Sequence, residues 1–317
     1  MSNILSLARI SGSLIADIRC RGHSGLSFGV GHGAPFHYVL KGRCWLITEH
    51  DSFEVRAGDL LLVPQWIQHG VGVTRRAPLQ EVTAVVKAHG LPVWTHGTLR
   101  QPLVFGVGRG DETLHFLSGL FTFEGRGSMR LLEQLPPVVH LDAETARIGP
   151  QLQMALSFVS QESGVVQPGY EAVASRLMDL LFIQILRAVM LQRISLTGDL
   201  AGLADPKLSR ALAAIHSFPD RRWSVAGLAA EAQLSRTLFA DTFRSTLGVT
   251  PMQYVSEWRL QLAERALIDT RSSVDDIRSQ LGFRSPFAFS RAFKRYTGSS
   301  PREYRRLHGQ QARGPNG

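Results

Sequence analysis

The sequence predicts a multidomain α+β chain, with an N-terminal β-barrel, a helical segment and a C-terminal domain built only of helices. Three observations predict this class. Short apolar runs separated by turns fill residues 25–90, the apolar period becomes helical from Ala143, and a twelve-residue pattern occurs twice near the C-terminus. Residues 243–254 read FRSTLGVTPMQY and residues 293–304 read FKRYTGSSPREY. A chain of 317 residues is long enough for two domains that each bury a core.

The first part of the chain has the pattern of a β-barrel or sandwich. Short runs such as FHYVL, RCWLIT and DLLLVP are separated by expected turns at Gly42 and Gly58. Short strands at this spacing are typical of these two folds. The apolar stretch TLHFLSGLFTF at 113–123 is expected to join the same sheets, before two prolines at 136–137 interrupt the pattern. Residues 1–142 are therefore predicted to form one β domain.

Residues 143–194 are predicted to be helical, with one helix near 143–161 and another from about Tyr170 to Arg193. The second helix contains RLMDLLFIQILRAVML, which is apolar around nearly its whole circumference and must be covered on more than one side. Packing within one subunit would cover it, and so would a second copy of the chain; we favour a homodimer seam. Residues 195–206 contain glycine, aspartate and proline and are expected to form the linker.

The positive charge of the chain lies in its last third. Residues 1–205 carry 17 Lys and Arg and 17 Asp and Glu, whereas residues 206–317 carry 18 and nine. The whole net charge of +9 therefore belongs to the repeated region. A compact basic domain favours nucleic acid as its partner over a membrane, because no amphipathic Lys-rich helix is present. A merely solvated basic face is the alternative that charge alone leaves open.

No segment has the pattern of a signal peptide or a membrane span. Residues 1–15 lack a basic start before their apolar residues, and the most apolar run, 177–191, contains charged residues. The protein is therefore expected in the cytoplasm, associated with the nucleoid, with no membrane partner. Two cysteines, Cys20 and Cys44, are too few for a disulfide framework and are expected to be small core residues.

The repeat extends beyond twelve residues. The offset is 49 residues from Ser224 to Ser273 and 50 residues from Ser235 to Ser285, so the second copy has one extra residue in its turn. Each copy has the pattern of a short helix opened by a serine N-cap, a turn, and a second serine-capped helix. A glycine suited to a left-handed C-cap and a Thr-Pro or Ser-Pro pair then start another helix. Each copy is therefore predicted to be a helix-turn-helix.

In each second helix, phenylalanines four residues apart are expected to pack inward, which turns other positions outward. The outward positions are Arg236, Thr237, Ala240, Asp241 and Arg244 in the first copy, and Pro286, Phe287, Ser290, Arg291 and Lys294 in the second. All of these except Pro286, together with Arg295, are predicted to contact DNA. Arg291 is the preferred base contact, with guanine its usual partner, and Lys294 and Arg295 are expected at phosphates. Two such helices about 34 Å apart can enter successive major grooves on one face of DNA. The alternative is that the repeat is only a packing unit.

These residues resemble the C-terminal domain of the AraC/XylS family of bacterial transcription regulators. The resemblance covers about residues 206–306 and includes LSRTLFADTFRSTLGVTPMQYVSEWRLQLAERAL and SVDDIRSQLGFRSPFAFSRAFKRYTGSSPREYR. It implies a seven-helix domain at 207–306, with recognition helices at 236–246 and 286–296. Such a domain binds double-stranded promoter DNA and usually activates transcription, which makes RNA polymerase a further candidate partner. Residues 307–317 are expected to be a disordered tail.

Asp241 departs from the pattern of this family, in which a basic residue often occupies the position. The second copy has Arg291 at the equivalent position. A carboxylate there cannot contact phosphate favourably. It can accept a hydrogen bond from cytosine N4, or it can orient Arg236 or Arg244.

The front part of the chain is similar to the cupin-type sensor domains found in this family, on the fragments FHYVLKGRCWL and AGDLLLVPQWIQHGV. Gly58, Pro64 and His69 have the spacing of a second cupin motif, with Trp66 where glycine is usual. The resemblance implies a sensor at 1–142 for a small-molecule effector. The candidate ligand-binding residues are His37, Trp45, Trp66 and His69, which would line an apolar pocket with a few polar groups. The alternative is that they simply fill the barrel.

Three functions therefore compete. The preferred one is a DNA-binding regulator, an activator controlled by a small-molecule effector, without a cofactor. The second is a metal-dependent cupin enzyme, such as an oxygenase, with an accessory DNA-binding domain. It needs at least three convergent ligands, and only His37 and His69 qualify, so no metal site and no catalytic residue is predicted. The third is a regulator whose front domain binds no small molecule and serves dimerisation or protein contact.

Overall fold

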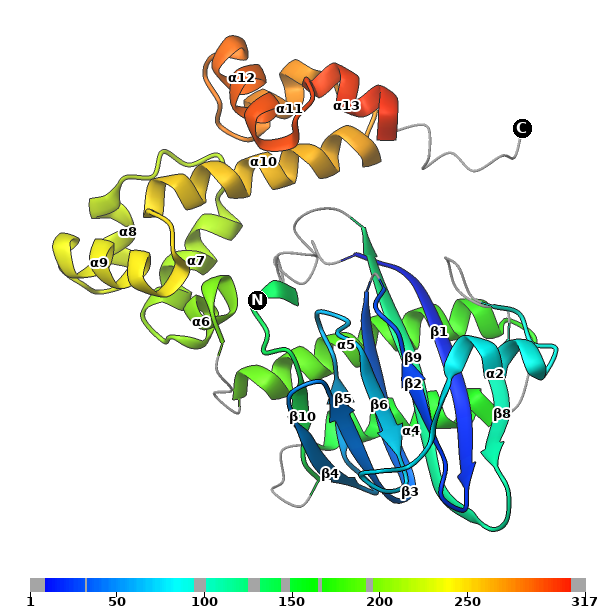
Figure 1. Ribbon diagram of the computed structural model, residues 1–317. Helices are drawn as coiled ribbons and strands as arrows, with labels where there is room; N and C mark the ends of the chain where they lie inside the picture. Colours follow the sequence, from blue (N-terminus) through cyan, green and yellow to red (C-terminus); the bar gives the residue numbers. More distant parts are fainter. Residues whose placement is uncertain are drawn as a thin grey trace. The chain divides into compact units, whose positions relative to one another are not determined.

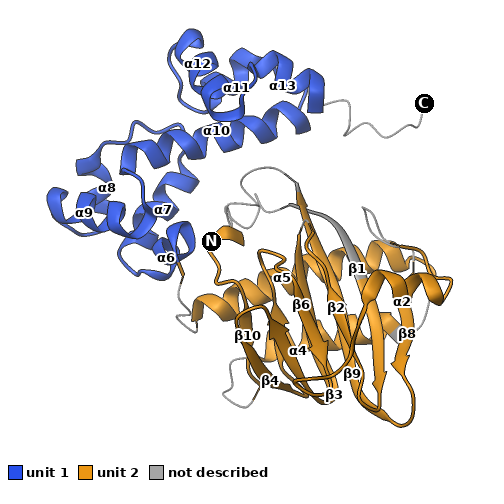
Figure 2. Cartoon of the chain, in the orientation of Figure 1, with its two compact units in different colours: residues 1–4, 197–317 blue, residues 5–196 orange. Residues whose placement is uncertain are grey.

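The computed structural model describes residues 9–31, 33–93, 101–124, 132–143, 149–164, 167–191 and 196–308. The chain divides into two compact units, one of residues Leu5–Leu196 and one of Thr197–Gly317 with Met1–Ile4 (Figures 1 and 2). All ten strands lie in the first unit, whereas the second contains only helices among its described residues. The predicted α+β class, with a β domain before an all-helical one, is confirmed.

The first unit is built on a curled ten-stranded sheet, whose main path runs β7-β2-β6-β3-β9-β1-β8. The strands β4 and β5 pair with β3, and β10 pairs with β5. The strand bounds are β1 Arg9–Arg21, β2 Gly25–Phe28, β3 Ala34–Thr48, β4 Ser52–Arg56, β5 Leu60–Leu62, β6 His69–Gly72, β7 Leu79–Glu81, β8 Leu103–Gly108, β9 Glu112–Glu124 and β10 Val139–Leu141.

The long strand β3 joins the two halves of the curl. Its first half pairs with β9 and β5, and its second half pairs with β4 and β6. The expected turn at Gly42 is instead a bend within this strand, marked by a register shift between Val39 and Lys41. Gly42 has a φ of 87°, and a Cβ there would lie 2.3 Å from the carbonyl oxygen of Thr113. Only glycine therefore allows β9 to approach at this point.

Apolar side chains from both halves of the sheet form one core cluster, which includes Leu26, Val107 and Phe116. Cys20 and Cys44 belong to the same cluster, and both are free thiols. Burial raises the pKa of Cys20 to about 11 and that of Cys44 to about 12. Since the thiolate is the reactive form, both side chains act as core residues and not as nucleophiles at neutral pH.

Three helices complete the first unit: α2 (Val82–Ala88), α4 (Pro150–Gly164) and α5 (Tyr170–Leu191). Figure 1 shows α4 and α5 across one face of the sheet, and both contact β1. The ring of Phe182 on α5 lies 5.2 Å from that of Phe121 and 5.0 Å from that of Phe123 on β9. The helical segment predicted at 143–194 is thus part of the same unit as the sheet. No helix among the described residues is long and apolar enough to cross a membrane.

The second unit contains eight helices within residues 197–308, all of which are described. Seven of them correspond to the domain expected at 207–306, and the last extends two residues into the expected tail: α7 Leu208–Ser217, α8 Val225–Glu231, α9 Arg236–Leu247, α10 Pro251–Asp269, α11 Val274–Gln280, α12 Pro286–Thr297 and α13 Pro301–His308. The eighth, α6 (Gly198–Ala204), lies in the segment expected to be the linker. It buries Leu200, and a Cβ on Gly202 would lie 3.0 Å from side chains of both α7 and α9. Residues 198–204 therefore belong to the helical unit, which corrects the expected linker.

A buried histidine makes the stability of the helical unit sensitive to acid. The Nε2 atom of His216 on α7 lies 2.8 Å from the hydroxyl oxygen of Tyr254, and its ring lies 4.0 Å from that of Trp258. Burial lowers the pKa of His216 to about 3. In the unfolded chain the His216 side chain takes up a proton near pH 6.5, whereas in the folded unit it stays neutral down to about pH 3. Its contribution to the free energy of unfolding is therefore fully present above pH 6.5 and is lost as pH falls toward 3.

We expect the free energy of unfolding of the helical unit to fall by about 2 kcal/mol between pH 7.5 and pH 5 through this group. Urea denaturation of the full chain, with amide exchange in α10 reporting on this unit, measures the change. His216→Phe should flatten the pH dependence, whereas His308→Phe, a change at an exposed histidine of α13, should not. An unaltered slope in His216→Phe would contradict this account.

Candidate functional sites

The pairs α8–α9 and α11–α12 are two helix-turn-helix units of the same design. The hydroxyl of Ser235 accepts a hydrogen bond from the amide three residues on at 3.3 Å, and Ser285 does the same at 3.2 Å. Gly248 and Gly298 follow α9 and α12 in left-handed conformation, with φ of 76° and 89°. The predicted N-caps and C-caps are thereby confirmed in both copies.

The extra residue of the second copy lies in its turn. Each turn contains one left-handed residue, Gln233 with φ of 56° in the first copy and Gly282 with φ of 75° in the second. One residue separates Gln233 from the N-cap Ser235, whereas two separate Gly282 from the N-cap Ser285. The change of offset from 49 to 50 follows from this difference.

The two second helices also bury the same positions. Phe239 and Phe243 of α9, and Phe289 and Phe293 of α12, are at most 1% exposed. The order of exposed, half-buried and buried residues is identical over residues 236–246 and 286–296. The repeat in the sequence is therefore a repeat in three dimensions, with one outward face on each helix.

The structure exposes most of the residues predicted to contact DNA. The exposed ones are Arg236, Thr237, Asp241 and Arg244 on α9, and Phe287, Arg291, Lys294 and Arg295 on α12, while Ala240 and Ser290 are half-buried. Pro286, the remaining outward position, is also exposed. Phe287 is 75% exposed, which is unusual for a phenyl ring. A phenyl ring in a major groove can contact the methyl group of thymine.

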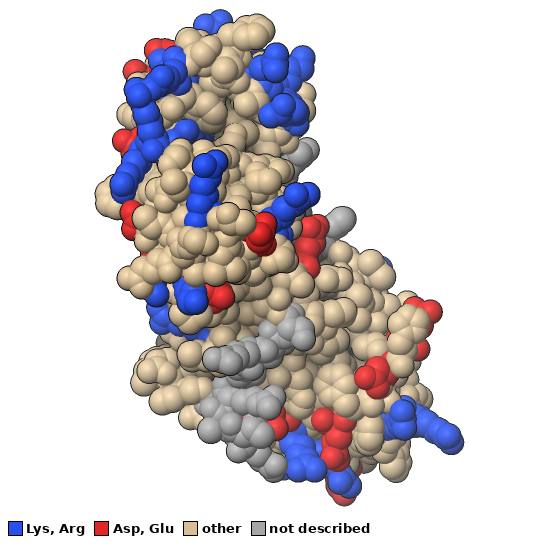
Figure 3. All heavy atoms as spheres, turned by 90° about the vertical axis from the view of Figure 1, so that its left-hand side faces the viewer, with Lys and Arg blue, Asp and Glu red and all other residues tan. Residues whose placement is uncertain are grey.

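The basic side chains of these two helices are free to bind a ligand. Within residues 197–308, no intramolecular hydrogen bond or ion pair engages the guanidinium of Arg236, Arg244 or Arg291. Six arginines elsewhere in the unit are held by backbone carbonyls or carboxylates: Arg210, Arg221, Arg259, Arg265, Arg278 and Arg305. Figure 3 shows Lys and Arg side chains over one face of the helical unit. Free guanidinium groups on the outward face suit guanine edges and phosphates.

Asp241 is exposed, and within the described helical unit no ion pair holds its carboxylate. It therefore does not orient Arg236 or Arg244 in this structure. Its two oxygens are available as hydrogen-bond acceptors, which is the role that a cytosine N4 amino group could satisfy.

Arg259 of α10 braces the two helix-turn-helix units against each other. Its Nε and Nη2 atoms donate to the carbonyl oxygens of Pro219 and Arg221 at 2.6 and 2.8 Å, in the segment between α7 and α8. The same guanidinium lies 5.9 Å from the ring centroid of Phe283, in the turn between α11 and α12. A Cβ on the neighbouring Gly282 would lie 2.5 Å from the carbonyl oxygen of residue 220. The sequence predicted a helix starting after the first copy but gave no signal for Arg259.

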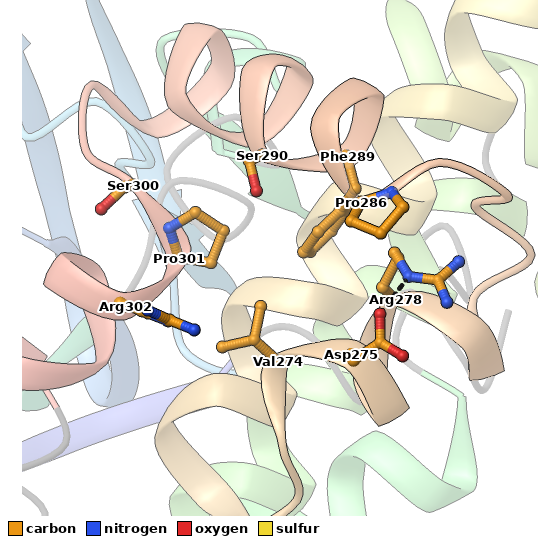
Figure 4. Close-up of a pocket in the computed structure, with 9 residues that line it drawn as sticks. All are labelled: Val274, Asp275, Arg278, Pro286, Phe289, Ser290, Ser300, Pro301 and Arg302. Carbon is orange, nitrogen blue, oxygen red and sulfur yellow. Dashed lines mark hydrogen bonds and ion pairs between the residues drawn. The ribbon is translucent and has the colours of Figure 1, made fainter.

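A groove of about 360 Å³ lies beside the second recognition helix, between α11, α12 and the start of α13 (Figure 4). Ser290, Ser300 and Arg302 line it on one side, and an ion pair of 2.7 Å joins Asp275 to Arg278 on the other. Hydroxyl and guanidinium donors at this place can hold a phosphate of a DNA strand that passes α12. In the sequence, the Ser300-Pro301 pair indicated only the start of a helix, and no pattern pointed to Arg302.

The first unit holds a pair of buried histidines. The Nε2 atoms of His37 and His69 lie 2.9 Å apart, and both residues are at most 2% exposed. The Nδ1 atom of His69 lies 2.7 Å from the carbonyl oxygen of Ile67, which can only accept, so this nitrogen carries the proton. Neutral His69 then accepts at Nε2 from His37, whose Nδ1 has no hydrogen-bond partner. Burial lowers the pKa of both histidines, and each stays neutral at pH 7.

The surroundings of this pair do not suit a metal ion. The ring of Phe28 lies 4.7 Å from that of His37 and 5.1 Å from that of His69, and the ring of Phe116 lies 5.9 Å from that of His37. Within the described residues, no group of three or more His, Cys, Asp or Glu side chains converges on one point. Two ring nitrogens that are hydrogen-bonded to each other and surrounded by phenyl rings do not form a metal coordination shell.

An apolar cavity of about 170 Å³ lies on the other side of Phe28, between α2 and the sheet. Most of its wall is apolar and comes from β1, β8, β9 and α2. The lining residues are Ala16, Ile18, Phe28, Pro35, Trp66, Val82, Thr83, Val86, Val93, Leu103, Phe105, Ser118, Gly119 and Leu120. Of the four candidate ligand-binding residues, Trp66 alone lines this cavity. The rings of His37 and His69 do not line it and pack against Phe28, which does.

Trp45 lies away from the cavity, which corrects its expected place in a pocket. Its neighbours on β3, Cys44 and Leu46, point into the core, and successive side chains of a strand point to opposite faces. Trp45 is accordingly half-buried on the outer face, with the guanidinium carbon of Arg75 5.6 Å from its ring centroid. The sequence alone did not show which face of β3 would be inside.

Trp66 is held in a left-handed backbone conformation, with φ of 39°. A conformation of this kind costs on the order of 1 to 3 kcal/mol for a residue with a Cβ, and glycine adopts it readily. Its indole packs so closely on Gly31 that a Cβ on that glycine would lie 2.7 Å from the ring. Glycine, which is usual at this position of the cupin motif, would adopt this conformation without strain. This chain has a strained tryptophan at the same position.

The outer side of the two long helices of the first unit exposes large apolar residues. On α4, Met154 is 60% exposed and Phe158 is 46% exposed; on α5, Val173 and Leu180 are each 41% exposed and Leu191 is 85% exposed. The opposite side of α5 is covered by its own sheet, as the Phe182 contacts show. Burial within the subunit thus accounts for one side of this helix and leaves the other uncovered.

Two different family models match the two units of the chain, and the boundary at residues 196–197 lies between the two matches. A model of the cupin family matches residues 1–191, and a model of the helix-turn-helix domain matches residues 228–307. The first match covers more than half of the chain.

Similar proteins extend over nearly the whole length of the chain. It is 32% identical to the HTH-type transcriptional regulator MtrA of Neisseria gonorrhoeae, over 98% of this chain and 99% of that protein. It is 31% identical to the HTH-type transcriptional regulator AlkR of Acinetobacter baylyi, over 85% and 86%. A protein of Streptomyces lividans named as an AraC-like transcription regulator is 29% identical over 96% and 97%. Among solved structures, the DNA-binding domain of AdpA with target DNA is 37% identical over 36% of this chain and 99% of its own, with a TM-score of 0.32.

Proposed function

Since this chain belongs to the AraC family of helix-turn-helix transcription regulators with an N-terminal cupin domain, we propose that it activates transcription as an effector-controlled dimer. Regulators of this family bind DNA in a sequence-specific manner, and this chain is a regulator of that kind and not an enzyme. The observation that carries the proposal is the pair of matching recognition helices with free outward arginines. Promoter DNA in the cytoplasm is the proposed target.

In this proposal α9 and α12 read two blocks of bases on one face of the duplex. Arg291 contacts a guanine, Asp241 accepts from a cytosine, and Phe287 contacts a thymine methyl group. Lys294, Arg295 and the Ser300–Arg302 edge of the groove hold phosphates, which supply affinity without sequence preference. The Arg259 brace keeps the two blocks one helical turn apart.

Dimerisation is proposed through the apolar side of α4 and α5. Exposed apolar side chains on two adjacent helices are costly in water, and a second copy can cover them in a symmetric contact. Such a dimer holds two DNA-reading units together. RNA polymerase is the proposed further partner of the DNA-bound protein, as expected for an activator.

Effector control is proposed through the cupin domain. A ligand changes the equilibrium between two arrangements only when it binds one of them better than the other. The apolar cavity beside Trp66 is the proposed place of binding, because it is the described pocket nearest to the predicted ligand residues. The competing possibility, a front domain that only dimerises, remains the alternative when no small molecule alters operator binding.

Replacing Arg259 with methionine tests the tandem reading. We expect wild-type protein to prefer two base blocks at one fixed spacing. Arg259→Met removes both bonds to the 219–221 segment, so we expect preference between the correct spacing and one lengthened by two base pairs to fall about tenfold. Competition binding with the two duplexes measures the ratio of the affinities for the correct and the lengthened spacing.

Arg271→Met is the matched control for this experiment, because Arg271 is an exposed arginine directly after the same helix and lies outside the segments that Arg259 contacts. Its spacing preference should equal that of the wild type. If Arg259→Met keeps the full preference, α10 alone sets the spacing and the proposed brace is wrong.

A further inference from the structure

We propose that the cavity beside Trp66 is the effector site and that it takes a small, uncharged hydrophobic molecule. The inference rests on the proposed function, in which an effector acts through the cupin domain. It adds the chemical class of the ligand and the argument from the cavity wall for its place. Three features of the cavity carry it: its lining, its size and the strained residue in its wall.

The lining excludes a charged ligand. Among the lining residues that the structure describes, none is charged, and Thr83 and Ser118 carry hydroxyl groups. A carboxylate or an ammonium group in this space would lose its hydration without gaining an opposite charge. His37 and His69, whose rings pack against Phe28, are both neutral and are hydrogen-bonded to each other. An apolar molecule loses no comparable hydration.

The size of the cavity fits a small ligand. It measures about 170 Å³. An apolar protein cavity of about 150 Å³ is large enough for benzene. The site therefore suits a ligand of about six to ten non-hydrogen atoms, such as a monocyclic aromatic hydrocarbon or a short alkane.

The backbone at Trp66 supports a role for this wall beyond core packing. Tryptophan occupies a left-handed position with φ of 39°, where glycine would be relaxed. Strained residues of this kind cluster at ligand sites, where the surrounding structure keeps them in place. Here Gly31 provides the space for the indole, because any side chain at that position would collide with it. The two residues together hold an aromatic surface against the cavity.

Binding of three matched probes to the full chain tests the class of ligand. Toluene, benzoate and benzylammonium have similar size and differ in charge. We expect toluene to bind saturably in calorimetry and to raise the melting temperature, and the two ions to bind at least about tenfold more weakly. Equal or tighter binding of either ion, or no saturable binding of toluene, would overturn the proposal.

Variants of the wall test the place of binding. Val82→Phe fills the cavity from α2, and Trp66→Gly removes one wall; each should weaken toluene binding about tenfold. Trp45→Ala, outside the cavity, should leave it unchanged. Toluene affinity that survives both wall variants, or that falls equally in Trp45→Ala, would place binding elsewhere and overturn the site.

A melting comparison tests the strain independently of any ligand. Because glycine adopts the left-handed conformation without penalty, ligand-free Trp66→Gly should melt at a higher temperature than Trp66→Ala, although alanine is otherwise the better residue. The reverse order would contradict a strained Trp66.

Operator binding with and without toluene separates this inference from the proposed function. If toluene binds as expected but leaves operator affinity unchanged, the site is retained and effector control through it is wrong. If operator binding is intact and toluene does not bind, the site is wrong and the DNA-reading function is unaffected.

Discussion

Replacing Arg291 with alanine should weaken binding to the cognate operator by about 1 to 3 kcal/mol and relax the preference at one base position. The reason is its outward place on α12 and a guanidinium that nothing within the described helical unit engages. Such a group can pair with both acceptors of a guanine edge. Titration of wild type and Arg291→Ala against the operator, single-base variants and random duplex, at one stated salt concentration, measures both effects.

Arg295→Ala is the matched control, since Arg295 lies on the same helix and is proposed at a phosphate. It should weaken binding to operator and random duplex by the same factor and lower the slope of affinity against salt by about one. Equal losses on the two kinds of DNA in Arg291→Ala would instead assign that residue to a phosphate.

Replacing Leu180 with glutamate should convert the protein from dimer to monomer and reduce its affinity for a two-site operator by about 100-fold or more. Leu180 lies on the uncovered side of α5 and is 41% exposed in the single chain. A carboxylate buried in a seam would remain unpaired, which opposes association. Sedimentation measures the mass, and titration against operators with one and two binding sites measures the loss of joint binding.

Val104→Glu is the control, because Val104 is a 50% exposed apolar residue of β8, outside α4 and α5. This variant should remain a dimer with wild-type operator affinity. A Leu180→Glu protein that is still a dimer, with unchanged unfolding, would show that α5 is not the seam.

The DNA-reading half could be predicted from the sequence in detail because its signals are local. Serine caps, C-terminal glycines and phenylalanines four residues apart each act within one or two helical turns. Their repetition at offsets of 49 and 50 gave the two helices and even the extra turn residue, which lies between Gly282 and Ser285. The linker was the exception, because α6 is a short helix that is held by packing of Leu200 and Gly202 against the unit and not by strong caps.

The fold class of the cupin domain could be predicted from the sequence, but the walls of its cavity could not. A continuous bent strand β3 replaced the expected turn at Gly42, because the glycine serves a close approach of β9. Trp45 and Trp66 looked equivalent in the sequence, yet one lies on the outer face and one lines the cavity. Strand face and cavity walls depend on pairing between residues far apart in the chain, which a local pattern does not contain.

In the proposed function, two matched helices of one chain, α9 and α12, read two blocks of DNA at a fixed spacing. Selection of bound sequences from random duplex DNA by the purified full-length protein, at a stated salt concentration, tests it most directly. The account predicts an enriched motif with two contacted blocks whose centres lie about one helical turn apart, each lost when the outward residues of α9 or α12 are replaced. A motif with a single contacted block, or equal enrichment of all sequences, would contradict it.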